Sequence, residues 1–230
     1  MRSILIKKAG IFIDLAIYIT VMFAIRELYF EQFSFIINGL MWSFTCLLIA
    51  MWRMHARGVT WKNLGLVKPT NYKKTALVTG GILAATVVTI VSFNILKDNF
   101  NWFPVVEVVE TSTEPTVSKF GDLKGNWLLF FSIMPMILIE SSLEELLDRG
   151  FLMNWFEKLF SNTWFATVIA VLLQAAIFGF RHSYDFSSRS VTTGLIGLVM
   201  GIAYVAFGRK LWPLILAHCI LNTMSMMDRV

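Results

Sequence analysis

Hydrophobic and polar residues follow one another along this chain in long blocks rather than with the short period of a soluble strand or helix. An α-helix needs ~20 mainly apolar residues to cross a bilayer, and fewer inside a bundle. Apolar blocks near that length cover residues 9–29, 33–52, 75–96, 126–143, 163–180, 190–207 and 211–227. This pattern predicts an all-α fold, a polytopic membrane helix bundle with about seven, or as many as eight, transmembrane helices.

The composition is that of a membrane protein rather than of a soluble domain. Hydrophobic residues make up 57% of the 230 residues, and charged residues only 15%. Cys46 and Cys219 both lie inside apolar blocks, which favours buried thiols over a disulfide framework or a zinc cluster. We expect a single membrane-embedded domain over residues 1–230, with N-terminal spans in 1–125 and the motif-bearing half in 126–226.

The connection between the second and third blocks is strongly basic. Its charged residues are Arg53, Arg57, Lys62, Lys68, Lys73 and Lys74, with no acidic residue among them. The positive-inside rule places residues 53–74 in the cytoplasm, and two crossings before them place the N-terminus on the same side. Orientation in the membrane, with contact to membrane lipid, accounts for this basic segment, so we expect no nucleic-acid partner.

The sequence lacks a P-loop, a dinucleotide fingerprint and a metalloprotease motif with two histidines one helical turn apart. An ATP-driven transporter made of this chain alone is therefore excluded. What remains is a set of polar and aromatic residues with helical spacing in the C-terminal half. They are Glu144, Glu145 and Arg149; Phe178 and His182; His218 and Asn222.

The two carboxylates of the first group are expected to have different surroundings. Residues four apart stack on one face of a helix, so Glu145 is expected to pair with Arg149 while Glu144 points about 100° away. Ionisable residues within membrane spans usually face a bundle interior or a water-filled cavity. The free carboxylate of Glu144 could then act as a general base on water. The alternative is a solvated ion-pair network at a helix end.

The two histidines occupy different settings. His218 and Asn222 stack four apart inside the last apolar block, where their N–H groups could donate to a developing oxyanion. The alternative for this pair is an interhelical hydrogen bond that holds helices together. His182 ends another block, four residues after Phe178, and by itself fits an interfacial histidine.

In this order the groups resemble the motifs EExxxR, FxxxH and HxxxN of the CPBP (CAAX protease and bacteriocin-processing, or Abi) family. These are glutamate intramembrane proteases related to the type II CAAX prenyl endopeptidases. The resemblance covers residues 126–226. It implies that Glu144 and His182 activate the attacking water and that His218 and Asn222 bind the oxyanion.

The resemblance also implies supporting roles for Glu145, Arg149 and Phe178. It implies no cofactor, and no covalent acyl-enzyme is expected because none of the matching positions is Ser, Thr or Cys. The partner is a peptide or protein substrate, lipidated or not, such as a prenylated C-terminal peptide or a leader peptide. A chain this short with these motifs looks prokaryotic, and we expect a multi-pass protein of the cytoplasmic membrane.

Two features complicate this interpretation. Asp148 occupies a motif position that is usually apolar, so it either crowds Glu144 with like charge or points toward Arg181 or Arg189. The predicted topology leaves His182 near the outer end of its block and Glu144 near the inner end of another. Because the apolar pattern continues through residues 150–156, the fourth helix could run on and place Glu144 deeper. The resemblance to prenyl endopeptidases implies a chamber that faces the cytosol, whereas the charge pattern leaves the side of access open.

Two other functions use the same residues. Glu144, His182 and His218 form a chemically reasonable ligand set for catalytic zinc, since two histidines and a carboxylate leave an open position on the metal. A non-catalytic immunity protein, or a protein that binds or transports peptides, could use the same polar cavity for binding alone.

Overall fold

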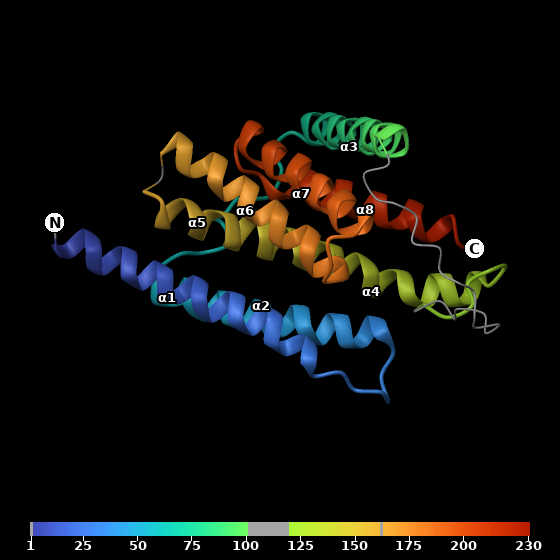
Figure 1. The fold of residues 1–230 in the computed structure, drawn as a ribbon, viewed down its shortest axis with the longest axis horizontal. Coiled ribbons are helices and arrows are strands. Elements are labelled where there is room, and N and C mark those ends of the chain that lie inside the picture. Colours follow the sequence, from blue (N-terminus) through green and yellow to red (C-terminus); the bar gives the residue numbers. More distant parts are fainter. Residues whose placement is uncertain (1, 101–119, 162) are drawn as a thin grey trace.

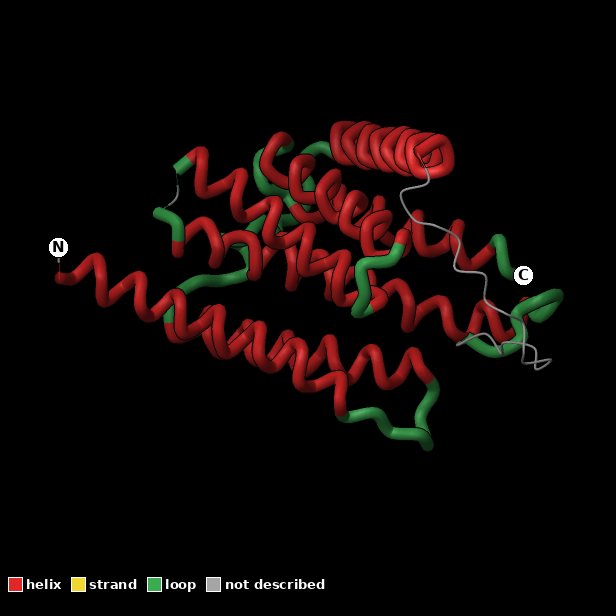
Figure 2. Tube along the Cα trace, viewed as in Figure 1, coloured by secondary structure: helices red, strands yellow, loops and turns green. Residues whose placement is uncertain are grey.

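The computed structural model describes residues 2–100, 120–161 and 163–230, which form helices joined by short connections (Figures 1 and 2). The α-helices are α1 (Arg2–Ala24), α2 (Phe35–Ala56), α3 (Tyr72–Phe100), α4 (Trp127–Glu145), α5 (Met153–Leu159), α6 (Trp164–Ser183), α7 (Ser188–Ala206) and α8 (Leu211–Met227). A 3₁₀ turn, η1 (Ile25–Glu27), follows α1, and a π-helical segment, η2 (Leu146–Leu152), joins α4 to α5. These ranges contain no β-strand, and the all-α prediction is confirmed.

Six of the described helical segments are long and apolar enough to cross a membrane. They are Lys8–Glu27, Phe35–Ala56, Tyr72–Phe100, Trp127–Leu159, Trp164–Ser183 and Ser188–Ala206. The seventh predicted span corresponds to α8, a shorter apolar helix of 17 residues. At 1.5 Å per residue α8 is roughly 25 Å long, less than the hydrocarbon core of a typical bilayer. The six long apolar helices make the chain a multi-pass integral membrane protein.

The helix that corresponds to the fourth predicted block is longer than that block of apolar residues. Helix α4 continues through η2 into α5, giving one span of 33 residues from Trp127 to Leu159. The prediction that this helix runs on is confirmed, and Glu144 consequently lies near its middle rather than at its end. π-Helical turns inside α-helices occur frequently at functional sites. Here the π-helical segment begins directly after Glu145.

The helices give the bundle two chemically different ends. At one, which we call the basic end, α1 and α3 begin, α2 ends and α7 turns into α8; the N–H of Leu211 there donates to the carbonyl of Gly65 (3.1 Å). We call the other the cavity end, after the cavity that is described below. There α1 and α8 end, α2 and α4 begin and α6 turns into α7. Arg26 donates to the carbonyl of Arg181 (2.6 Å) at this end, and Gly125 donates to that of Val230 (2.7 Å).

Glycines set the close approach of α6 and α7. A Cβ on Gly179 would overlap the carbonyl oxygen of Ser190 and lie 2.8 Å from the Cα of Gly194. A Cβ on Gly197 would lie 3.1 Å from a ring carbon of Phe178. Small residues allow helix backbones to pack closely in membranes. The contact fixes α6, which carries Phe178 and His182, against α7.

Candidate active site

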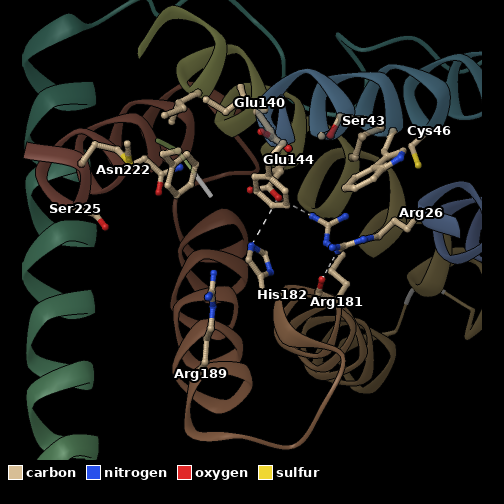
Figure 3. A pocket seen from close by; sticks show the side chains of 18 of the residues that line it. Arg26, Ser43, Cys46, Glu140, Glu144, Arg181, His182, Arg189, Asn222 and Ser225 are labelled. Atoms are coloured by element: carbon tan, nitrogen blue, oxygen red, sulfur yellow. Dashed lines mark hydrogen bonds and ion pairs between the residues drawn. The ribbon is translucent and has the colours of Figure 1, made fainter. Parts of the chain in front are cut away.

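A cavity of about 290 Å³ lies at the cavity end of the bundle (Figure 3). Its lining comes from the end of α1, the first half of α2, the second half of α4, the α6–α7 turn and the end of α8. The polar and charged residues that line it are Arg26, Ser43, Glu140, Glu144, Arg181, His182, Arg189, Asn222, Ser225 and Arg229. Segments far apart in the sequence therefore meet around one polar space.

Glu144 lies between the two histidines of the motifs. One carboxylate oxygen is 3.8 Å from Nε2 of His182, and the other is 3.5 Å from Nε2 of His218. Each residue comes from a different helix, α4, α6 or α8. Both distances exceed those of good direct hydrogen bonds, and they leave the carboxylate able to share a small polar group with each ring. The separation that the predicted topology imposed on Glu144 and His182 does not exist in the folded bundle.

Glu145 points into the protein instead. Its Oε1 accepts from Nη1 of Arg149 (3.0 Å) and from Nδ1 of His218 (2.7 Å), and its side chain is fully buried. The helical pair predicted from the spacing is present. Because Nδ1 of His218 donates to this carboxylate, Nε2 faces Glu144, which lines the cavity; His218 itself is not among the lining residues. An imidazolium at His218 would have a second N–H at Nε2 for an oxyanion.

His182 is oriented by its own helix. Its Nδ1 lies 2.6 Å from the carbonyl oxygen of Phe178, which can only accept, so Nδ1 carries the proton. In the neutral ring Nε2 is then an acceptor facing the Glu144 carboxylate, which is also an acceptor. A molecule with two donor hydrogens, such as water, satisfies both groups. This arrangement suits the removal of a proton from water.

The turn after α6 holds His182 at the rim of the cavity. Tyr184 ends the helix in the left-handed conformation (φ 58°), and Ser190 Oγ donates to the carbonyl of Asp185 (2.6 Å). Asp185 accepts from the backbone N–H of Ser187 (3.0 Å). Hydrogen bonds from the Ser187 side chain and backbone lower the pKa of the Asp185 carboxyl below its ordinary value. The turn is thus closed by its own polar groups.

Phe178 lies close to two guanidinium groups. The Cζ atoms of Arg149 and Arg181 lie 4.5 and 5.3 Å from its ring centroid, and the His182 ring centroid lies 4.5 Å away. Cations over an aromatic face are attracted by the ring quadrupole. The buried ring therefore packs against both arginines and the histidine, which is a physical reason for an aromatic residue at this motif position.

Asn222 lies on α8 and lines the cavity. Its Nδ2 donates to Ser141 Oγ (2.7 Å), and that hydroxyl donates in turn to the carbonyl of Ile137 (2.8 Å). A side-chain amide carries two N–H groups, so one remains for a ligand in the cavity. Ser141 is a partner that the sequence interpretation missed, because nothing in the spacing links it to a residue on the last helix.

The structure decides the open question about Asp148. Its Oδ2 lies 2.6 Å from Nη2 of Arg181, and the same nitrogen lies 3.3 Å from Glu144 Oε1. Asp148 is fully buried, whereas Arg189 is exposed and lines the cavity. Arg181 therefore sits between two carboxylates, and Asp148 contacts Arg181 rather than Arg189. Arg26, which donates to the Arg181 carbonyl, was also missed from the sequence.

Within the described parts of the chain, no group of three or more His, Cys, Asp and Glu side chains has the geometry to hold a metal ion. Glu144, His182 and His218, the ligand set considered for zinc, are among the residues covered by that statement. The zinc version of the site accordingly gains no geometric support, and metal dependence is a question for experiment.

The fold and the site define a class: a multi-pass membrane helix bundle with a carboxylate, two imidazoles and an amide gathered in its C-terminal half. The family model described as type II CAAX prenyl endopeptidase Rce1-like matches residues 126–224. The match extends from the start of α4 into α8 and includes all three motifs, so the resemblance to the CAAX-protease family is confirmed over this stretch. Comparisons with curated proteins and with solved structures give no match.

Proposed function

We propose that this protein is an intramembrane endopeptidase that hydrolyses a peptide bond with an activated water molecule. The observation that carries the proposal is the Glu144 carboxylate, placed 3.8 Å from His182 and 3.5 Å from His218 in the wall of a cavity that Glu144 and His182 line. The similarity of residues 126–224 to a protease family supports the same reaction class. Glu144 and His182 would activate the water, and His218 and Asn222 would bind the oxyanion.

The proposed steps use only these side chains and water. Glu144 takes a proton from water while His182 accepts the other hydrogen bond, and the water oxygen bonds to the substrate carbonyl carbon. The carbonyl oxygen becomes an oxyanion that receives hydrogen bonds from His218 and Asn222. As the tetrahedral intermediate collapses, the C–N bond breaks and the proton passes from Glu144 to the leaving amine.

The other motif residues would act through these four. Glu145 orients His218 from the side opposite the cavity, and Arg149 balances the buried carboxylate of Glu145. Phe178 packs against both arginines and fixes the Nδ1 proton of His182 through its backbone carbonyl. Buried ionic groups need such partners, because an unpaired buried charge is strongly destabilising.

We further propose the setting in which this reaction occurs. The substrate is a peptide or protein segment, lipidated or not, and the protein lies in a prokaryotic cytoplasmic membrane with its N-terminus and residues 53–74 in the cytoplasm. The basic residues of that segment support the orientation. Membrane lipid solvates the bundle, and lipid has a further role only if the substrate is lipidated.

Mass spectrometry of membrane peptides from cells that express wild type or Glu144→Gln tests the proposal. We expect uncleaved precursors to accumulate with Glu144→Gln and with His182→Ala. Matched controls are Glu31→Gln and His55→Ala, because both residues are exposed and neither lines the cavity. Equal peptide patterns for wild type and both cavity variants, with all proteins present in the membrane, would reject hydrolysis and leave a peptide-binding or immunity role.

A chelator distinguishes the zinc-dependent alternative from the metal-free mechanism. If turnover of an accumulated precursor by purified protein is unchanged by 1,10-phenanthroline, and no stoichiometric metal accompanies the protein, the metal-free mechanism stands. Loss of turnover with chelator and recovery with added Zn²⁺ would assign Glu144, His182 and His218 to the metal instead.

A further inference from the structure

The cavity and the basic residues occupy opposite ends of the bundle. The cavity is lined by the ends of α1, α6 and α8 and the beginnings of α2 and α7. The reverse ends of α2, α7 and α8 meet the basic segment: α2 runs into it, and the turn between α7 and α8 hydrogen-bonds to Gly65 within it. These three helices thus lead from one end of the bundle to the other.

The charges differ between the two ends. Described residues at the basic end include Arg53, Arg57, Lys62, Lys68, Lys73, Lys74, Lys158, Arg209 and Lys210, and the acidic residues near them, Asp14 and Glu157, are held in ion pairs. At the cavity end lie Arg26, Lys124, Arg189 and Arg229 together with Glu27, Glu31, Asp122, Asp185 and Asp228. The excess of basic residues marks the first end as cytoplasmic.

Packed aromatic side chains separate the site from the basic end. Tyr18 and Phe151 have ring centroids 4.8 Å apart, and Phe151 stacks on Trp155 at 4.2 Å. All three are fully buried and belong to the hydrophobic core that also contains Leu147, a residue of the cavity lining. Cores of this kind are close-packed and leave few voids larger than a water molecule. A second pocket, of about 190 Å³, lies at the basic end, and its lining shares no residue with the cavity around Glu144.

The cavity reaches the surface of the protein at its own end of the bundle. Tyr184, Arg189, Ser225 and Arg229 line the cavity and are exposed, and Figure 3 shows Arg189 and Ser225 beside His182 and Asn222. Given the proposed peptidase activity and orientation, we infer that the site is entered from the non-cytoplasmic face. Its substrates are then polypeptides exposed on that face, such as exported chains or the outer parts of membrane-anchored ones, rather than cytosolic C-terminal peptides.

Thiol labelling tests the side of entry without any need for catalysis. In a Cys46→Ala, Cys219→Ala background, one variant carries Ser225→Cys at the mouth of the cavity and a matched control carries Thr70→Cys in the exposed basic segment. Spheroplasts are treated with a membrane-impermeant maleimide before or after permeabilisation. We expect Ser225→Cys to be labelled in intact spheroplasts and Thr70→Cys only after permeabilisation.

Protection of Ser225→Cys in intact spheroplasts, or labelling of Thr70→Cys there, overturns the inference. Phe186→Cys, at the 85% exposed position in the α6–α7 turn, replaces Ser225→Cys if that variant does not reach the membrane. Failure of the proposed function would look different, because it would leave the labelling pattern intact while Glu144→Gln cells accumulated no precursor. Where precursors accumulate, we expect added protease to remove them from intact spheroplasts, and their protection would contradict entry from outside.

Discussion

Two neighbouring glutamates on one helix have opposite environments, and this contrast organises the site. Glu144 faces the cavity with a side chain that is 17% exposed, whereas Glu145 is fully buried between Arg149 and His218. A direct carboxylate–imidazole contact fixes which ring nitrogen carries a proton, much as carboxylates do for histidines in metal and triad sites. The second glutamate can therefore influence the reaction without touching substrate.

Replacement of this positioning residue gives the first prediction. Glu145→Gln keeps the shape but removes the charge that balances Arg149 and accepts from His218. Outer-shell partners of metal-ligating histidines typically contribute about 10–100-fold, and we expect a fall in kcat of the same order here, with little change in KM. Turnover of an accumulated precursor by purified protein provides the measurement. A rise in KM at constant kcat would instead indicate a role in substrate binding.

Asp148 and Arg181 give a second prediction at the scale of residues. Removing one partner of a buried ion pair leaves an uncompensated charge and costs about 3–5 kcal/mol, whereas replacing both can be neutral. Asp148→Leu removes the shorter of the two carboxylate contacts of Arg181 and leaves that with Glu144 (3.3 Å), so it should lower the melting temperature. Asp148→Leu with Arg181→Leu should recover part of this loss. Thermal unfolding in detergent measures this coupling. Additive losses in the double variant would show that the 2.6 Å contact contributes nothing.

Sequence spacing could predict local pairs but not the partners across the bundle. Glu145 and Arg149 follow from the helical repeat, and that pair is present in the structure. The contact of Glu145 with His218 joins residues 73 positions apart and was not predicted. The contact of Asp148 with Arg181 joins residues 33 positions apart, and the sequence offered it only as one of several alternatives. They depend on how the helices rotate and cross, which an isolated periodic pattern does not determine. The catalytic roles of these residues remain predictions.

At the scale of elements, the contact between α6 and α7 sets the position of two motif residues. Phe178 and His182 lie on α6, which approaches α7 closely because both helices carry glycine at the crossing. The apolar blocks predicted both helices. Their close approach depends on which faces meet, and this is decided by tertiary packing rather than by local sequence.

A methyl group at the crossing should therefore disturb the site. Gly179→Ala would place its Cβ against the backbone of Ser190 and Gly194, neither of which can rotate away. Overpacking of this kind costs about 1–3 kcal/mol, and displacement of His182 should also reduce turnover. Gly80→Ala is the matched control on α3, because a Cβ there meets nothing within 4 Å. We expect the control to match or slightly exceed wild type in thermal stability. Equal behaviour of the two variants would contradict the close-packing explanation.

At the scale of the molecule, the half without motifs completes the site. The family match covers residues 126–224, yet α1, η1 and α2 contribute part of the cavity wall, including Met22, Arg26 and Gly39. Buried Asp14 on α1 accepts from Nε1 of Trp155 (3.2 Å) on α5 and so ties the two halves together. The sequence predicted several spans in this half, but it gave no sign that they would surround Glu144.

A fragment experiment separates the contributions of the two halves. A chain that begins between α3 and α4 contains every motif residue but lacks the α1–α2 wall, so we expect it to leave precursors uncleaved even when it is present in the membrane. Helices that insert independently can associate without a covalent link, because packing and polar contacts hold them together within the bilayer. Co-expression of a second chain carrying α1 to α3 should therefore restore cleavage.

The control second chain carries Asp14→Leu, which leaves Arg53, Arg57 and Trp155 without their shared acceptor and should weaken the recovery. Precursor abundance, normalised to the amount of each fragment in the membrane, is the measurement. Full cleavage by the C-terminal fragment alone would show that the first three helices are dispensable for the chemistry.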